Sequence, residues 1–598
     1  MLYFILYNKW VDKNNKMCYN NKMKMNIKGE YKMSHWIEKA NIYHIYPLGF
    51  CGCEKYLSEA SAEPVARIRK AIDWIPHIKG MNFNAIYFGP VFESVKHGYD
   101  TIDYTKIDRR LGTNDDFKAV CDELHKNGIR VILDGVFNHV GRDNPMFRDL
   151  REKGQGSRYK DWFAGVNFGG RSPEGDNFSY EGWNGHYNLV KLNLWNDEVI
   201  DYLLSAIKMW IDEWGIDGIR FDAADCLRDE FIKRVHSFTR SIKPDFWLMG
   251  EIIHGNYARW ANSEMFDCVT NYQCYKGIYS SHNDRNYFEI AHSIEYQMGQ
   301  YGNTYMYNFL DNHDVVRLAS VLKNPDHAEC CYTMMYTMYG VPSVYYGSEF
   351  GLKGAKGSGE SADDAIRPCL DLNNIPERND NLAKHIAALG SIRQQSEVIQ
   401  SGSYSKLDLK NQTFLYKREK NGKTAYIALN ISDGDYTFRF NAGCAKLCDL
   451  LSGAEFNVNN GFAEITVPRN KSMILVDKAD AAPVCAPAEE EKVEIKPEPV
   501  IEKPVESCVT PAADKGNGVK GIGYNDNRQP VIGGHYKHFK GGDYVLLNVA
   551  KDHENCEKMA VYMSLNGKPD VWVRPLEMFL EDVDDHGNIK ARFAFISD

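Results

Sequence analysis

Two short apolar segments of the chain each lead to a carboxylate. Residues 218–221 run into Asp222, and residues 246–249 are followed after one glycine by Glu251, with a helix-like segment between the two. A strand, a helix and a second strand make a parallel βαβ unit, so we expect both carboxylates at the same edge of a sheet. Paired carboxylates can act as nucleophile and as general acid, and barrel enzymes keep such groups at the C-terminal ends of their strands.

A carboxylate at a strand end can also do no more than cap the following helix, because helix N-termini attract acidic groups. That alternative weakens because the pattern recurs. Residues 131–134 lead to Asn138 and His139, and residues 307–311 lead to Asp314. Four apolar segments therefore place Asp, Glu or His at the same expected end of a strand.

These four segments, in this order, resemble the four signature regions of the α-amylase superfamily, family 13 of the glycoside hydrolases. The matching runs are residues 134–139, residues 218–222, the segment around Glu251, and residues 309–314. The resemblance covers roughly residues 36–478. Four ordered motifs on expected strand ends make it far more specific than any one of them alone.

The resemblance implies cleavage of a glucosidic bond with retention, for which two carboxyl groups stand roughly 5–5.5 Å apart. It assigns Asp222 as the nucleophile that forms a β-glucosyl-enzyme, Glu251 as acid and then base, and Asp314 as stabiliser of the oxocarbenium-like transition state. Arg220 shares a strand face with Asp222, so we expect it to keep that carboxylate ionised. Glu251 must instead stay protonated, with a pKa raised by neighbouring carboxylates.

Further residues enter through the same resemblance. Tyr99 would stack beneath the sugar being cleaved, and its neighbours would shape the pocket. The full implied substrate-binding set is His97, Tyr99, Asp100, His139, Arg220, His254 and His313. Asn138 is a calcium ligand in many family members. We expect no organic cofactor, because the sequence shows neither a Gly-rich phosphate loop between a strand and a helix nor a serine-centred elbow.

Two motifs are similar to those of the neopullulanase, cyclomaltodextrinase and maltogenic amylase subgroup. Residues 189–193 resemble its Met-Pro-Lys-Leu-Asn run, and residues 251–254 resemble its Glu-Ile-Trp-His run. Two features depart from the subgroup. Asp225 and Cys226 stand where it has Asn-Glu, and its N-terminal β-domain does not precede the first expected strand near residue 42. In the family, the positions of Asp225 and Cys226 line the part of the site that binds the acceptor. The preferred linkage and product therefore stay open.

Repeated strand and helix signals predict an α/β protein built on a (β/α)₈ TIM barrel. We expect residues 1–32 to be a non-native or disordered extension, with translation starting at Met33. The barrel should then span residues 33–400, with a short domain B inserted at about 140–188. An antiparallel β-sandwich domain C over 401–478, a Pro/Glu/Ala-rich linker over 479–515 and a small β-rich domain over 516–598 should follow. The last domain resembles a bacterial domain of unknown function through its motifs Tyr-x-His-Phe-Lys-Gly and Trp-x-Arg-Pro-x-x-Met-Phe.

Composition narrows the partners and the compartment. The net charge of −10 argues against nucleic acid, since phosphate binding needs a basic surface. The 15 cysteines show no legible disulfide framework, which favours a reducing cytosol. Residues 2–7 are too short for a signal-peptide core, so we expect a cytoplasmic protein that does not bind membranes.

We therefore predict a retaining hydrolase that cleaves α-1,4 bonds in maltooligosaccharides, cyclodextrins or starch fragments. Within the enzyme class, an oligo-α-1,6-glucosidase and an α-glucan transglycosylase on the same barrel are alternatives. From another class, an inactive glucan-binding module is an alternative that any enzyme fold allows. The joint presence of Asp222, Glu251 and Asp314 argues against it. The oligomeric state stays open.

Overall fold

The computed structural model describes residues 36–302 and 304–481, and shorter segments between residues 521 and 597. The expected start at Met33 and nearly all of the expected linker lie outside the described residues. The chain divides into two compact units, Met1–Glu491 and Lys492–Asp598, and each is described by itself. No helix among the described residues is both long and apolar enough to cross a bilayer.

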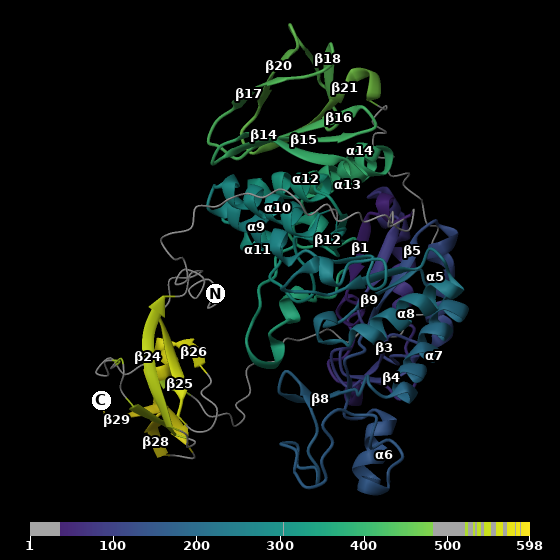
Figure 1. The fold of residues 1–598 in the computed structure, drawn as a ribbon, viewed down its shortest axis with the longest axis vertical. Coiled ribbons are helices and arrows are strands. Elements are labelled where there is room, and N and C mark those ends of the chain that lie inside the picture. The colour runs from purple at the N-terminus through teal and green to yellow at the C-terminus, as the bar shows by residue number, and fades with distance from the viewer. Residues whose placement is uncertain are drawn as a thin grey trace, which may run out of the picture. The chain divides into compact units, whose positions relative to one another are not determined.

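Eight parallel strands close into a barrel within the first unit (Figure 1). Around the barrel they are β1 (Ile42–Ile45), β13 (Val341–Tyr345), β12 (Met306–Asn308), β11 (Cys268–Thr270), β10 (Trp247–Gly250), β9 (Gly218–Phe221), β5 (Arg130–Gly135) and β2 (Ala85–Phe88). The predicted barrel is confirmed. Strand β10 begins one residue later than the apolar run at 246 indicates.

Alternation along each strand separates the barrel interior from the helix-facing side. On β5, Ile132 belongs to one buried apolar cluster, whereas Val131 belongs to the larger cluster that includes the helices. On β9, Ile219 and Phe221 belong to the larger cluster. Because neighbours along a strand point to opposite faces, Arg220 points into the barrel. A period of two thus selects which polar side chains reach the interior.

Helices cover the outside of the barrel. They include α5 (Asn114–Lys126), α7 (Asp197–Trp214), α8 (Asp229–Ile242), α9 (Tyr272–Asn283), α10 (Tyr287–Tyr301), α12 (Ala328–Thr337) and α13 (Asp380–Gln395). Helix α5 begins after Thr113, whose side chain accepts a hydrogen bond from the Asp116 N–H. It ends before Gly128, whose φ of +75° suits glycine.

The helical pattern over residues 65–78 is interrupted in the structure. The chain forms a 3-10 helix at Arg67–Arg69 and then α3 (Lys70–Asp73) and α4 (Ile75–Gly80), with Trp74 between α3 and α4. Pro76 occupies the first turn of α4. Proline has no N–H to donate and is tolerated only in the first turn of a helix, so the helix must restart there.

A small excursion leaves the barrel after β5. It contains α6 (Pro145–Lys153) and a three-stranded sheet in the order β6 (His139–Gly141), β8 (His186–Lys191) and β7 (Gly182–Trp183). A separate hairpin, β3 (Phe92–Ser94) and β4 (Thr101–Ile107), follows β2. Both excursions start from C-terminal strand ends, so they build on the face where the carboxylates are expected.

Antiparallel sheets follow the barrel in the same unit. The six-stranded sheet has the order β14 (Ser403–Leu409), β15 (Thr413–Lys420), β16 (Lys423–Asn430), β21 (Lys471–Asp477), β18 (Lys446–Asp449) and β19 (Glu455–Asn457). The second sheet pairs β17 (Tyr436–Asn441) with β20 (Phe462–Val467). Leu415 and Phe438 lie in one buried cluster that joins the two sheets, as in a β-sandwich.

The second unit is also rich in antiparallel strands. Its five-stranded sheet has the order β26 (Val571–Pro575), β25 (Lys558–Ser564), β24 (Asp543–Lys551), β23 (His535–His538) and β29 (Phe593–Ser597). A three-stranded sheet has the order β22 (Gly521–Gly523), β27 (Asp582–Asp585) and β28 (Asn588–Ala591). One short helix, α15 (Leu576–Leu580), follows β26. Tyr536, Phe579 and Phe593 share its small core.

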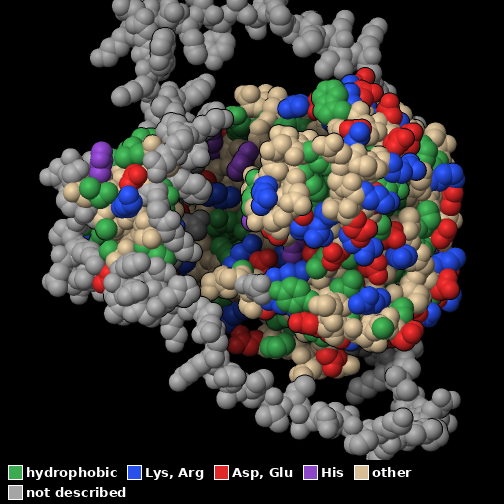
Figure 2. All heavy atoms as spheres, turned by 90° about the horizontal axis from the view of Figure 1, so that it is seen from below, with side chains coloured by type: hydrophobic (Ala, Val, Ile, Leu, Met, Phe, Trp, Pro, Cys, Tyr) green, Lys and Arg blue, Asp and Glu red, His purple; other side chains and the backbone are tan. Residues whose placement is uncertain are grey.

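The surface in Figure 2 carries charges of both signs. On the face drawn there, Lys and Arg side chains are interspersed with Asp and Glu side chains and do not gather into one basic stripe. Mixed charge of this kind gives no electrostatic footprint for a polyanion on that face.

Candidate active site

The register of three neighbouring strands brings the carboxylates together. Asp134 on β5 pairs with Arg220 on β9, and Arg220 pairs in turn with Met249 on β10. Asp222 follows the end of β9 by one residue, and Glu251 follows the end of β10 by one residue. Parallel strands in this register place both carboxylates at the same end of the barrel.

Arg220 bridges three carboxylates. Its Nη1 donates to Asp134 Oδ1 at 2.8 Å and to Asp222 Oδ1 at 2.9 Å. Its Nη2 lies 2.6 Å from Glu251 Oε2. Arg220 is 3% exposed, and Asp222 and Glu251 are 8% and 9% exposed. One guanidinium therefore fixes the nucleophile and acid candidates in a nearly dry site, where such charge-assisted bonds are strong.

The charge balance differs from the sequence-based expectation for Asp222. Burial raises the pKa of Asp222 well above its usual range, and the carboxylates of Glu251, Asp134 and Asp314 add to the rise, although Arg220 opposes it. Arg220 lowers the pKa of Asp222, as expected, but burial and the neighbouring carboxylates outweigh it in the free protein. A single guanidinium shared among three carboxylates cannot neutralise all of them, so the ionisation of each carboxyl group depends on that of the others.

Glu251 is held by donors on three sides. Besides Arg220, the backbone N–H of Ala223 donates to its Oε2 at 3.1 Å, and the hydroxyl of Tyr272 donates to its Oε1 at 3.1 Å. Ala223 adopts a left-handed backbone with φ of 44°, which L-residues seldom adopt. Gly250 precedes Glu251, and a Cβ there would lie 2.6 Å from the Phe266 ring. Local backbone geometry thus aims this carboxyl group.

Asp314 and His313 form a second group at the same end of the barrel. Asp314 Oδ2 lies 2.8 Å from His313 Nε2, and its Oδ1 accepts from Arg367 Nη2 at 2.8 Å. Burial pushes the pKa of Asp314 upward, but the charges of His313, Arg367 and Arg220 outweigh it and hold this pKa well below its usual range. Tyr99 contacts His313 Nε2 through its hydroxyl and also donates to Asp134 Oδ2 at 3.1 Å. These contacts connect Asp314 to the Arg220 cluster.

His139 is a buried neutral imidazole beside the cluster. Burial lowers the pKa of His139 to about 4. Among the described residues, its Nε2 and the Nδ1 of His313 are buried without a protein hydrogen-bond partner. Buried polar atoms are nearly always paired. Two orphaned ring nitrogens at the same end of the barrel are therefore available to a bound ligand.

The depressed pKa of His139 predicts a pH-dependent stability. The unfolded chain binds a proton near pH 6.5, whereas the folded chain does so only near pH 4, so stability from this group is present above pH 6.5 and is lost as the pH falls toward 4. Between pH 7 and pH 5.5 the loss should be about 1 kcal/mol. Urea unfolding of the wild type and of His139→Gln at both pH values measures it. An equal pH dependence in the two proteins would contradict the assignment.

The other residues singled out from the sequence lie nearby to different degrees. His97 and Asp100 lie in the loop between β3 and β4, where the His97 N–H donates to Asp100 Oδ1 at 3.2 Å, and burial lowers the pKa of His97. The loop also carries Tyr99, so the three are brought together. His254 is exposed, three residues beyond Glu251, and its role in substrate binding stays a prediction.

Asn138 is buried, and its amide nitrogen lies 3.1 Å from His139 Nδ1. Calcium prefers sites with several oxygen ligands, including carboxylates. In residues 36–302, 304–481 and the described C-terminal segments, no three His, Cys, Asp or Glu side chains are grouped as a metal site. The structure thus offers Asn138 no carboxylate-rich ligand set, and calcium at Asn138 stays a prediction.

The sequence of this chain is similar to that of known glycoside hydrolases. Residues 68–388 match the family described as "Alpha amylase, catalytic domain". The chain belongs to the α-amylase family. A cyclomaltodextrinase from Bacillus sp is 29% identical over 433 residues, covering 68% of this chain and 75% of the relative. An intracellular maltogenic amylase from Bacillus subtilis is 28% identical over 409 residues, covering 65% of this chain and 68% of the relative.

The α-amylase-family assignment agrees with solved structures. A cyclomaltodextrinase structure superposes with a TM-score of 0.66 at 26% identity, covering 75% of this chain and 79% of that one. The protein is thus a glycoside hydrolase of the α-amylase type. Residues 534–595 match a domain family described only as a protein of unknown function, DUF1653, which confirms the resemblance seen in the C-terminal motifs.

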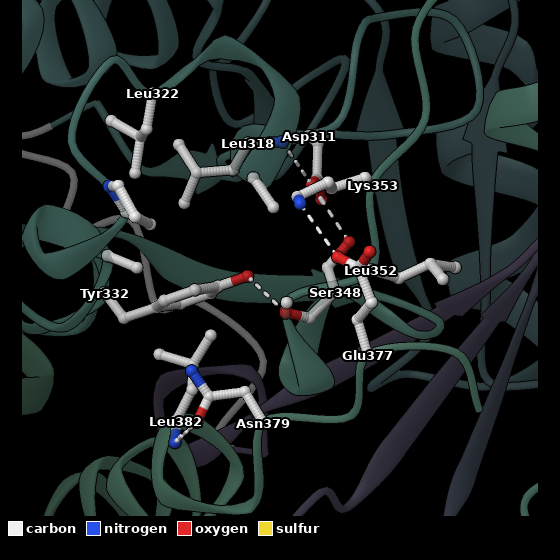
Figure 3. A pocket seen from close by; sticks show the side chains of 14 residues that line it. Asp311, Leu318, Leu322, Tyr332, Ser348, Leu352, Lys353, Glu377, Asn379 and Leu382 are labelled. Carbon is white, nitrogen blue, oxygen red and sulfur yellow. Dashed lines mark hydrogen bonds and ion pairs between the residues drawn. The ribbon is translucent and has the colours of Figure 1, made fainter.

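Within the fourth signature region of this α-amylase-family chain, Asp311 has a different role from Asp314. It lines a separate cavity of about 180 Å³, together with Leu318, Tyr332 and Leu382 (Figure 3). Its Oδ2 accepts from the Leu318 N–H and from Ser348 Oγ, each at 2.9 Å. Asp311 therefore fixes the loop after β12, which is the helix-capping alternative for a strand-end carboxylate.

Two residues of the site were not singled out from the sequence. Tyr272 stands at the start of α9, close after β11, so its place at a strand end was a usable signal. Arg367 pairs with Asp314, and its Nε also donates to the His313 carbonyl at 2.8 Å. It lies far beyond β13 in an irregular segment, and no local pattern indicates that it returns to the site.

Proposed function

We propose that this α-amylase-family enzyme is a retaining α-glucan hydrolase. It cleaves α-1,4-glucosidic bonds in maltooligosaccharides, cyclodextrins or starch fragments through a covalent β-glucosyl-Asp222 intermediate. The observation that carries the proposal is the bridge that Arg220 makes between Asp222 and Glu251. It fixes two carboxyl groups side by side in a buried pocket, as double displacement at one sugar carbon requires.

In the first step Asp222 attacks the anomeric carbon while Glu251 gives its proton to the leaving oxygen. As the general acid, Glu251 must carry a proton when substrate is bound, and Arg220 then stabilises the ionised Asp222. In the second step Glu251, now ionised, takes a proton from water as that water attacks the same carbon, which frees Asp222. Two inversions give net retention. Protein groups and water suffice, and no organic cofactor enters.

The remaining residues bind the sugar and stabilise charge. Asp314 stays ionised beside His313 and Arg367, so it can stabilise the positive charge that develops at the anomeric carbon. The orphaned Nε2 of His139 and Nδ1 of His313 are positioned to hydrogen-bond sugar hydroxyls. Tyr99 lies parallel to His313, with ring centroids 5.5 Å apart, and forms the aromatic wall of the pocket.

The names of the relatives support a substrate class. Two of the similar proteins are a cyclomaltodextrinase and an intracellular maltogenic amylase. We therefore place cyclodextrins and short maltodextrins among the substrates and the enzyme in the cytoplasm, where the free cysteines of the described chain stay reduced. An α-1,6-glucosidase or a transglycosylase on the same barrel is the alternative within this family.

Product analysis on β-cyclodextrin, soluble starch and pullulan tests the proposal. We expect the wild type to open the cyclodextrin ring to short maltooligosaccharides, and Glu251→Gln to lose this activity while its fold is retained by circular dichroism. Panose as the main product from pullulan would agree with attack on its α-1,4 bonds, whereas maltotriose would indicate attack on its α-1,6 bonds and favour the alternative. Absence of cleavage of all three substrates by the wild type would overturn the proposal in favour of a glucan-binding protein.

A further inference from the structure

We propose that Trp195, backed by Arg228, is a stacking platform that binds a glucosyl unit of the substrate away from the bond being cleaved. The inference rests on the proposed function and deepens it, because it assigns a preference for longer α-glucans to one exposed side chain.

Trp195 is the most exposed large hydrophobic residue that the described part of the chain presents, at 75%. Leaving an indole in water forgoes a favourable burial, so a strongly exposed tryptophan calls for an explanation at the surface. The guanidinium carbon of Arg228 lies 3.8 Å from the ring centroid. Since Arg228 covers one side and the ring is still mostly exposed, the opposite face of the indole is open to a ligand.

Two hydrogen bonds hold the backbone that carries this ring. The backbone N–H of Trp195 donates to Asn193 Oδ1 at 3.2 Å, and Arg228 Nη1 donates to the Leu194 carbonyl at 3.4 Å. Both Asn193 and Asn196 donate side-chain N–H groups to the Asp161 carbonyl. The platform is therefore preorganised, which lowers the entropy cost of binding.

The position of Trp195 links it to the active site. Lys191, four residues before it, pairs with His139 across β8 and β6. Four residues of chain span at most ~14 Å. Arg228 stands six residues after Asp222, at the start of α8. Both members of the platform thus lie at the end of the barrel that holds the carboxylates.

Trp183 contacts both the site and the segment that leads to the platform. Its ring centroid lies 5.5 Å from that of His139. Its side chain also interacts with the Cys226 thiol, two residues before Arg228. A partly exposed aromatic ring therefore contacts both His139 and the segment that leads to Arg228.

The surroundings favour a sugar over a protein partner. A protein interface needs a broad patch, of the order of 800 Å² on each partner, whereas Trp195 is a single ring followed by the exposed acids Asp197 and Glu198. A pyranose has apolar C–H faces that suit an aromatic ring and hydroxyls that suit flanking polar groups. An extended α-glucan leaving the pocket supplies such a ring at a distance from the cleaved bond.

The test compares long and short substrates. We expect Trp195→Ala to lower kcat/KM for maltoheptaose about 10-fold and to change that for maltotriose less than two-fold, because only the longer chain reaches the platform. Trp195→Phe should retain most of the wild-type kcat/KM for maltoheptaose. Titration calorimetry of maltoheptaose with Glu251→Gln and with the double variant Glu251→Gln/Trp195→Ala measures the same difference without turnover, so it is informative even if cleavage fails.

Phe462→Ala is the matched control, since this aromatic residue is 60% exposed on β20, in the antiparallel region after the barrel. This substitution should leave kcat/KM unchanged for both maltoheptaose and maltotriose. Equal losses on both substrates, or no loss on either, would overturn the platform. A lowered melting temperature with unchanged maltoheptaose binding would also overturn it, because the Arg228–Trp195 contact would then only join α7 to α8.

Discussion

Glu251→Ala should lose about 10²–10⁴-fold in kcat/KM on soluble α-glucan, since that is the usual contribution of a positioned general acid. Sodium azide should restore part of the rate and yield an α-glucosyl azide, because a small nucleophile can attack the β-glucosyl-Asp222 intermediate without help from a base. The loss should be smaller on substrates with an acidic phenol leaving group, which needs no protonation.

Asp222→Ala supplies the complementary variant. Here azide would replace the missing nucleophile and attack the substrate directly, with one inversion, so the azide product should be β. Two α products, or two β products, from the pair of variants would refute the assignment of roles. Asp311→Asn is a carboxylate control, because Asp311 bonds to Leu318 and Ser348 and should affect stability more than the stereochemical outcome.

Arg220→Gln should lower the free energy of unfolding by about 3–5 kcal/mol, because breaking a buried ion pair leaves charges without a partner. Three carboxylates face this guanidinium, within 2.6–2.9 Å at their nearest oxygens. Catalytic activity should fall at least as far as in Glu251→Ala. Arg220→Lys should recover little, since an ammonium cannot reproduce the planar geometry that spans Asp134, Asp222 and Glu251.

The stability loss of Arg220→Gln should shrink as the pH falls from 8 to 5. Protonation of the unpaired carboxylates removes their repulsion, and these groups bind protons in the folded variant at higher pH than in the unfolded chain. Urea unfolding across this range measures the trend. Arg439→Gln breaks an exposed pair with Glu464 and should change stability by less than about 1 kcal/mol. A loss for Arg220→Gln that does not depend on pH would contradict this account.

The sequence by itself determined the barrel, because apolar strand runs and helical periods alternate along the chain. It also located Asp222, Glu251 and Asp314, since each follows an apolar run at the same end. The register of β5, β9 and β10 is consistent with those placements. These features are local, and a local pattern is what a single sequence displays. The helical pattern over residues 65–78 did not indicate that the helix restarts near Pro76.

Only the tertiary structure decided which charges meet. Arg367 reaches Asp314 from far along the chain, Tyr272 donates to Glu251, and a single Arg220 is shared among three carboxylates. No spacing rule indicates such contacts, because they depend on how loops return over the barrel. The pKa of Asp222 also depends on both sequence and tertiary structure. Its strand position predicts that Arg220 lies beside it, but burial and the number of neighbouring carboxylates set the direction of its pKa shift.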